Sequence, residues 1–194
     1  MQFIVDRLAR LFAVLGGLVL SALVLMTCLS IVGRSFNAFL NDDWMQSFAP
    51  GIVNLLLSTG LGPVNGDFEL VEAGMAFAIF AFLPLCQLSG SHASVDIFTS
   101  MLPERAASVL RLVVDVVFAM VLVIIAVQLF SGMLSKRASG QTTLLLQFPL
   151  WWAYAASLSG AFVAAFVSCY VAVARFIELQ TGRTVLDEGE GADH

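Results

Sequence analysis

Charged side chains are scarce in this chain, and their scarcity argues against a soluble protein. Only 12% of its 194 residues are Asp, Glu, Lys or Arg, whereas soluble domains carry about 25%. Hydrophobic residues make up 59% of the chain, and its mean hydropathy is +0.93. The formal net charge of -5 argues against a nucleic-acid partner, because nucleic acids select basic surfaces. The composition therefore predicts an integral membrane protein surrounded by the lipid bilayer.

Motifs that carry catalysis are also missing. The sequence has no G-x-x-x-x-G-K-[ST] loop for nucleotide phosphates, no H-E-x-x-H zinc motif and no G-x-S-x-G nucleophile turn. Its only histidines are His92 and His194. Its three cysteines each lie inside an apolar stretch, which favours packing over a disulfide or a metal site. We therefore expect no catalytic activity, no cofactor and no bound metal.

Long gaps between charged residues indicate where the chain crosses the bilayer. A spanning helix needs about 20 apolar residues, because unpaired backbone groups are too costly in hydrocarbon. Four gaps predict helices over about 11–33, 70–88, 109–131 and 149–173. The first run is longer than a signal-peptide core and lacks an A-x-A-like cleavage site, so we expect it to be retained. The sequence predicts an all-α integral membrane protein with one membrane domain over 1–180 and a disordered acidic tail over 181–194.

A fifth gap, between Asp43 and Asp67, differs because glycine and proline interrupt it. Its best helical piece covers 44–58, which is roughly 20 Å long and too short for a hydrocarbon core of about 30 Å. Polar and apolar side chains fall on different faces of this piece, and Trp44 follows two aspartates, as at a membrane surface. We interpret it as an interfacial amphipathic helix between the first and second spans. A re-entrant helix or a fifth spanning helix is the alternative.

The distribution of Lys and Arg predicts the orientation, since cytoplasmic loops carry an excess of positive charge. With four spans, one side holds three cations and the other holds six. The three are Arg34, Lys136 and Arg137, and the six are Arg7, Arg10, Arg105, Arg111, Arg175 and Arg183. Both termini are therefore expected in the cytoplasm, although a fifth span would reverse this conclusion.

Acidic residues in or beside the spans are candidate contact residues, because ionisable groups in a membrane are functional candidates by default. Asp115 lies about a turn inside the third span, and Arg111 is placed four residues earlier, where the two can pair. This pair is either structural or a contact with a partner subunit. Glu69 and Glu72 open the second span, where acidic residues either stabilise the helix dipole or take part in docking on the outer side.

Small residues repeat every four positions along the fourth span in two stripes. Ser157 and Ala161 belong to one stripe, and Gly160 and Ala164 belong to the other. Small side chains let membrane helices approach closely, either within the bundle or against another subunit. We take these four residues as candidate subunit contacts.

Four motifs occur in a fixed order along the chain. They are Ser-Ile-Val-Gly-Arg-Ser-Phe-Asn at 30–37, Phe-Glu-Leu-Val-Glu at 68–72, Gly-Ser-His-Ala-Ser-Val-Asp-Ile-Phe at 90–98 with Leu102 and Pro103 after it, and Phe-Pro-Leu-Trp-Trp-Ala-Tyr at 148–154. In this order, with four spans, the chain resembles the small membrane subunit of TRAP (tripartite ATP-independent periplasmic) transporters, the DctQ family. The resemblance covers nearly the whole chain apart from 40–65 and the tail.

The resemblance implies a subunit of a sodium-driven importer of organic anions, often carboxylates, in the inner membrane of a bacterium or archaeon. In this family a periplasmic binding protein captures the substrate, a large membrane subunit carries it inward, and the small subunit braces the large one. Arg34, Glu69, Glu72, His92 and Asp96 match positions in the recurring motifs. We expect these residues to serve structure and subunit contact, with the substrate and sodium sites in the large subunit.

One departure from the family pattern lies on the predicted outer side, where members pass quickly from the first span to the second. Here the segment 40–65 intervenes, and its geometry bears on docking of the binding protein. The alternative functions are a membrane scaffold protein, a small homo-oligomeric exporter and an intramembrane enzyme, which would need paired polar residues at membrane depth. An exporter of that kind would need a membrane-buried carboxylate in the first span, and 11–33 contains none.

Overall fold

The computed structural model describes residues 2–48, 51, 53, 62, 64–89 and 104–181. In this part of the chain the helices are α1 (Gln2–Leu40), α2 (Asp43–Phe48), α4 (Asp67–Leu88), α6 (Glu104–Ser139) and α7 (Trp151–Thr181). These residues contain no β-strand, only an isolated bridge between Thr142 and Pro149 in the loop from α6 to α7. The described chain is therefore helical, as its composition predicts.

Four of these helices, α1, α4, α6 and α7, are long and apolar enough to cross a membrane, which confirms the four predicted spans. The helices extend beyond most of the predicted limits. The 39 residues of α1 are about 58 Å long at 1.5 Å per residue, nearly twice the hydrocarbon thickness of about 30 Å. The predictions are shorter because a gap between charges marks only the part in hydrocarbon. By contrast, α7 starts at Trp151 rather than 149, because Pro149 pairs with Thr142 in the loop.

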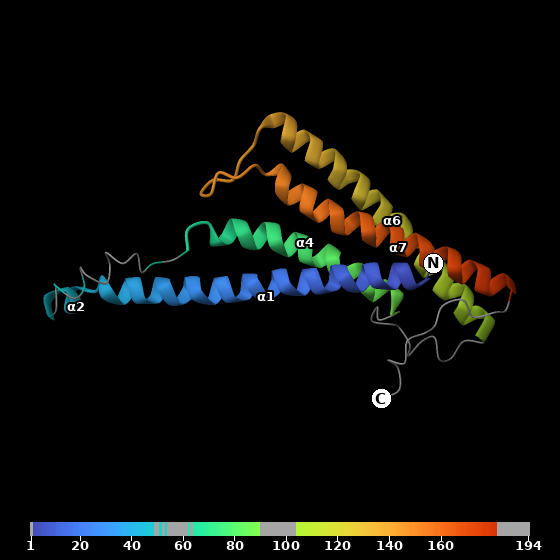
Figure 1. Ribbon diagram of the computed structural model, residues 1–194, viewed down its shortest axis with the longest axis horizontal. Helices are drawn as coiled ribbons and strands as arrows, with labels where there is room; N and C mark the ends of the chain where they lie inside the picture. Colours follow the sequence, from blue (N-terminus) through green and yellow to red (C-terminus); the bar gives the residue numbers. More distant parts are fainter. Residues whose placement is uncertain are drawn as a thin grey trace.

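The long helices pack in the order α1, α4, α7, α6 (Figure 1). Of the residues in the most apolar stretch of α7, 56% are buried, against 11% in α1 and 11% in α6. Thus α7 forms the core of the bundle. The outer helices α1 and α6 direct most of their apolar surface away from it, as expected for surfaces that meet lipid or a partner protein.

The two ends of the bundle bring different helix termini together. At the end where α1 begins, α4 and α7 finish, and Val5 packs there against Val167 and Val171 with Leu88 beside them. We refer to it as the first end. At the opposite, second end, α4 and α7 begin and the loop from α6 leads into α7 (Figure 1). The start of α1 and the finish of α7 therefore lie at the same end of the bundle.

Two glycines let the neighbours of α4 approach it closely. A Cβ atom on Gly16 of α1 would lie 3.0 Å from the Cβ atom of Ala81. A Cβ atom on Gly160 of α7 would lie 2.9 Å from the Cβ atom of Phe80 and 3.2 Å from the backbone nitrogen of Ala81. Ala81 is completely buried. The middle of α4 is therefore held between α1 and α7 at distances that only the smallest residues allow.

The segment between the first two spans contains α2, a helix of six residues. The predicted interfacial helix over 44–58 overlaps with α2, and most of its remaining positions lie outside the described residues. The predicted tail also lies outside them after Thr181. The interfacial position of α2 and the disorder of the tail stay predictions.

Candidate functional site

Charged side chains are confined to the ends of the spanning helices. The stretches 11–33 of α1, 73–88 of α4, 116–135 of α6 and 151–174 of α7 contain none. Charge in the hydrocarbon region is costly, so this distribution suits a bundle that crosses a membrane. The groups that could make specific polar contacts with a partner are therefore found at the first and second ends.

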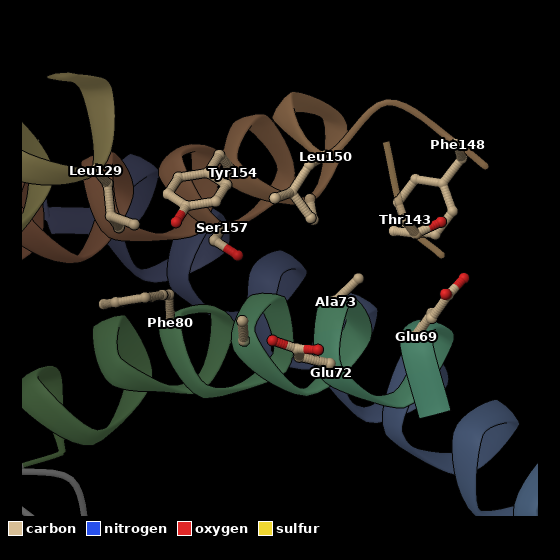
Figure 2. A pocket seen from close by; sticks show the side chains of 12 residues that line it. Glu69, Glu72, Ala73, Phe80, Leu129, Thr143, Phe148, Leu150, Tyr154 and Ser157 are labelled. Carbon is tan, nitrogen blue, oxygen red and sulfur yellow. The ribbon is translucent and has the colours of Figure 1, made fainter. Parts of the chain in front are cut away.

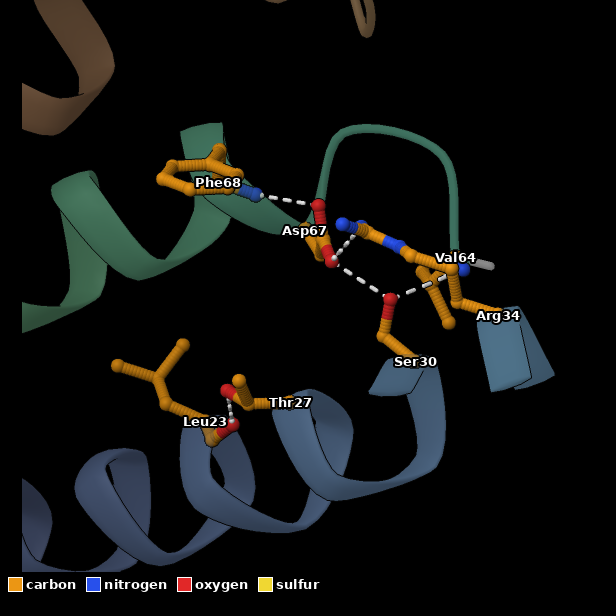
Figure 3. A network of polar contacts seen from close by, with 7 residues as sticks. All are labelled: Leu23, Thr27, Ser30, Arg34, Val64, Asp67 and Phe68. Atoms are coloured by element: carbon orange, nitrogen blue, oxygen red, sulfur yellow. Dashed lines mark hydrogen bonds and ion pairs between the residues drawn. The ribbon is translucent and has the colours of Figure 1, made fainter. Parts of the chain in front are cut away.

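Asp67, the first residue of α4, joins that helix to α1 at the second end (Figure 3). Its Oδ2 atom accepts a hydrogen bond from the hydroxyl of Ser30 at 2.6 Å and lies 3.4 Å from Nη2 of Arg34. Ser30 is fully buried, and its oxygen also accepts the backbone N–H of Val64 at 3.3 Å. A carboxylate is favourable at this position because the first N–H groups of a helix lack partners within the helix. Arg34, a predicted contact residue, thus takes part in a junction within the chain.

Glu69 fixes the loop between α6 and α7. Its carboxylate oxygens accept the backbone N–H groups of Leu145 at 2.6 Å and Leu146 at 2.9 Å. The loop is closed on itself, because the N–H of Thr143 donates to the carbonyl of Phe148 at 3.0 Å. Hydrogen bonds to an ionised acceptor are stronger than neutral ones. The predicted contact residue Glu69 therefore connects α4 to the tip of this loop.

A cleft of about 260 Å³ lies between α4 and α7, beside the loop that Glu69 holds (Figure 2). Glu72 stands on its α4 side, and Tyr154 and Ser157 stand on its α7 side (Figure 2). Among the described residues, none makes a hydrogen bond or an ion pair with the Glu72 carboxylate. We call this site the Glu72 cleft, and its lining includes Glu72, Ala76, Phe80, Phe148, Tyr154 and Ser157.

A second polar cluster joins three helices at the first end. Asp115 of α6 forms an ion pair with Arg175 of α7, with 2.7 Å between Oδ2 and Nε. Its Oδ1 atom accepts a hydrogen bond from Nε2 of Gln87 on α4 at 3.0 Å. The side chains of Asp115 and Arg175 are only 13% and 20% exposed, and Gln87 is buried. Polar contacts are strong in surroundings of low dielectric constant, so this cluster connects α4, α6 and α7.

The ion pair of Asp115 could not be found by looking along its own helix. The spacing in the sequence offers Arg111 as a partner, and the structure shows an ion pair between Asp115 and Arg175 on another helix. The pairing of Asp115 with Arg111 stays a prediction. Two signals could have pointed to the cluster. Gln87 is the one strongly polar side chain in the apolar stretch 73–88, and Arg175 is the charge that ends the gap of the fourth span.

The four small residues offered as subunit contacts are covered within the chain. Ser157, Ala161 and Ala164 are 3%, 0% and 0% exposed, and Gly160 lies against Phe80 of α4. Of the two alternatives for these stripes, packing within the bundle is the arrangement seen here. A partner would meet α7 on its opposite face, which carries larger exposed side chains.

Two predicted contact residues, His92 and Asp96, lie outside the described residues, so their role stays a prediction. In the described part of the chain, no group of three or more His, Cys, Asp or Glu side chains could hold a metal ion. The polar groups described above are suited to holding helices and a loop in place. The Glu72 carboxylate is the exception, since it faces a cleft without a described partner.

A protein-family model described as "Tripartite ATP-independent periplasmic transporters, DctQ component" matches residues 23–181. The matched range contains α4, α6, α7 and the part of α1 that carries Ser30 and Arg34. No curated protein and no solved structure matches the chain.

Proposed function

The chain belongs to the DctQ component family of tripartite ATP-independent periplasmic transporters, and we propose that it braces the large transport subunit of a sodium-driven importer. Members of this family are small membrane components of transporters and not a family of enzymes. They work with a large membrane subunit and a substrate-binding protein. The proposed substrate is an organic anion of the carboxylate class.

The observation that supports the bracing role is the absence of charge from the middle of all four spanning helices. An importer of anions driven by sodium needs polar groups at membrane depth to bind both ions. These helices offer small apolar contacts there, such as those of Gly16 and Gly160 with α4. Junctions at Asp67 and Asp115 join the helices at the two ends. This arrangement favours a rigid body, with the substrate and sodium sites in the large subunit.

The proposed orientation places the first end in the cytoplasm and the second end at the periplasmic face of the inner membrane. It rests on the excess of Lys and Arg at the first end. In this orientation the Glu69 loop and α2 lie on the side where a periplasmic binding protein delivers the substrate. The binding protein would contact either this surface or the large subunit alone.

Uptake of labelled organic acids tests this function. Cells that express the large subunit and the binding protein are compared with and without this chain, in media containing sodium or choline. We expect uptake only with this chain present and only with an inward sodium gradient. Equal uptake without the chain would contradict the bracing role, and uptake that persists in choline would contradict sodium coupling.

A further inference from the structure

We propose that the Glu72 cleft receives a basic side chain, a guanidinium or an ammonium group, from the large membrane subunit. This inference rests on the proposed function, because that function supplies the partner. Glu72 lies five positions after Asp67, the first residue of α4, and is therefore about 7.5 Å farther along the helix axis at 1.5 Å per residue. Glu72 is exposed on α4, and a carboxylate without a partner on a surface that meets another subunit favours an opposite charge on that subunit.

The chain's own cations at the second end are engaged elsewhere. Arg34 belongs to the Asp67 junction, and Lys136 donates a hydrogen bond of 2.7 Å to a neighbouring glutamine. The guanidinium carbon of Arg137 lies 5.6 Å from the centre of a tryptophan ring. The other cations with described side chains belong to the helix termini of the first end, and they are Arg7, Arg10, Arg111 and Arg175. The counter-charge of Glu72 therefore points to another molecule.

The dimensions and walls of the cleft suit a single cationic side chain. Its volume of about 260 Å³ falls below the roughly 300–1,000 Å³ of pockets for drug-sized ligands. The rings of Phe80 and Tyr154 line it, and aromatic faces attract guanidinium and ammonium groups. Because Glu69 fixes the loop beside it, the cleft is formed before a partner arrives, which lowers the entropic cost of binding.

A lipid amine carries the same charge, but the proposed contact with the large subunit favours a protein side chain. Leu150 and Ala153 line the cleft together with Glu72, and they flank Trp151 and Trp152, which mark the membrane interface on α7. The cleft therefore lies near the interface. A long Arg or Lys side chain on an adjacent spanning helix can extend to that level, with its apolar stem against the helices.

Photo-crosslinking identifies the occupant directly. The tagged chain carrying Ala73→benzoylphenylalanine, which places the crosslinker in the lining of the cleft and keeps Glu72, is expressed with the large subunit, illuminated in native membranes and analysed by mass spectrometry. We expect an adduct to a spanning segment of the large subunit that contains Arg or Lys. The same substitution at Leu25, which is 71% exposed on α1, is the control for a position outside the cleft. An adduct at position 73 to lipid alone, or to a segment without a basic residue, would overturn the proposal.

Charge variants provide the second test. Removing one partner of a charge-assisted hydrogen bond weakens binding by about tenfold or more, so Glu72→Gln should lower the affinity for the large subunit by that factor, and Glu72→Arg should lower it further. Asp6→Asn, which removes an exposed ion pair with Arg10 at the first end, should leave the affinity for the large subunit unchanged. If the unmodified chain binds the large subunit and both Glu72 variants bind equally well, this inference fails while the proposed function stands. If the unmodified chain does not bind, the proposed function itself fails.

Discussion

Replacing Gly160 by alanine should weaken the packing of α7 against α4. The new Cβ atom would lie 2.9 Å from the Cβ atom of Phe80 and 3.2 Å from the backbone nitrogen of Ala81, whereas ordinary contacts are 3.4–4 Å. Neither neighbour is the flexible end of a side chain, so one of the two helices has to shift to relieve the contact. Overpacking of this kind typically costs about 1–3 kcal/mol. Alanine gains about 1 kcal/mol in helix propensity, which offsets part of this cost, so we expect the free energy of unfolding to fall by up to about 2 kcal/mol.

The assay compares the unfolding midpoints of purified Gly160→Ala and Gly17→Ala in mild detergent. Gly17 lies on α1, and an added Cβ atom would meet nothing within 4 Å. Alanine is also the better helix former by about 1 kcal/mol. Gly17→Ala should therefore keep or raise the midpoint, and Gly160→Ala should lower it. Equal shifts in the two variants, or a higher midpoint for Gly160→Ala, would refute the close contact between α4 and α7.

Three further changes test the polar contacts. Asp115→Asn removes the charge that pairs with the largely buried Arg175 and should lower the free energy of unfolding by about 1–3 kcal/mol. This loss lies between the energy of a typical hydrogen bond in a membrane and the cost of breaking a buried ion pair. The double variant, Asp115→Asn with Arg175→Gln, should lose less unfolding free energy than the two single variants lose in sum. Strictly additive losses would contradict the ion pair. Glu69→Gln should speed hydrogen exchange at the two loop amides that it binds, while exchange in the middle of α7 stays unchanged. Unaltered exchange in the loop would exclude this role of Glu69. Ser30→Ala leaves the N–H of Val64 without its acceptor and should cost about 1–3 kcal/mol, and an unchanged unfolding midpoint would show that the junction adds no stability.

The four spanning helices could be predicted because the bilayer imposes both length and apolarity on them. The helix ends could not be predicted from the same signal. Arg34 closes the first charge gap, yet α1 continues to Leu40. The residues from 35 to 40 contain neither glycine nor proline, so nothing there breaks the helix. Charge gaps thus locate the hydrocarbon region, and local backbone chemistry decides where each helix stops.

The partners of the site residues depend on which helices pack side by side. Residue spacing along a single helix does not predict this. Spacing on one helix points from Asp115 to Arg111 and does not indicate the ion pair with Arg175 on α7 that the structure shows. Small residues indicate that two helices approach each other closely, but they do not reveal which helix is the neighbour. For Gly160 the neighbour is α4 of the same chain. The family motifs likewise single out Glu69 without revealing that it binds a loop.

The partner of the chain can be identified by affinity purification from native membranes. The tagged chain is purified in mild detergent, and the proteins that elute with it are identified by mass spectrometry. We expect a large polytopic membrane protein in stoichiometric amount, and the identity of that protein would direct the search for the transported anion. A chain that elutes alone or as a homo-oligomer would contradict the bracing role.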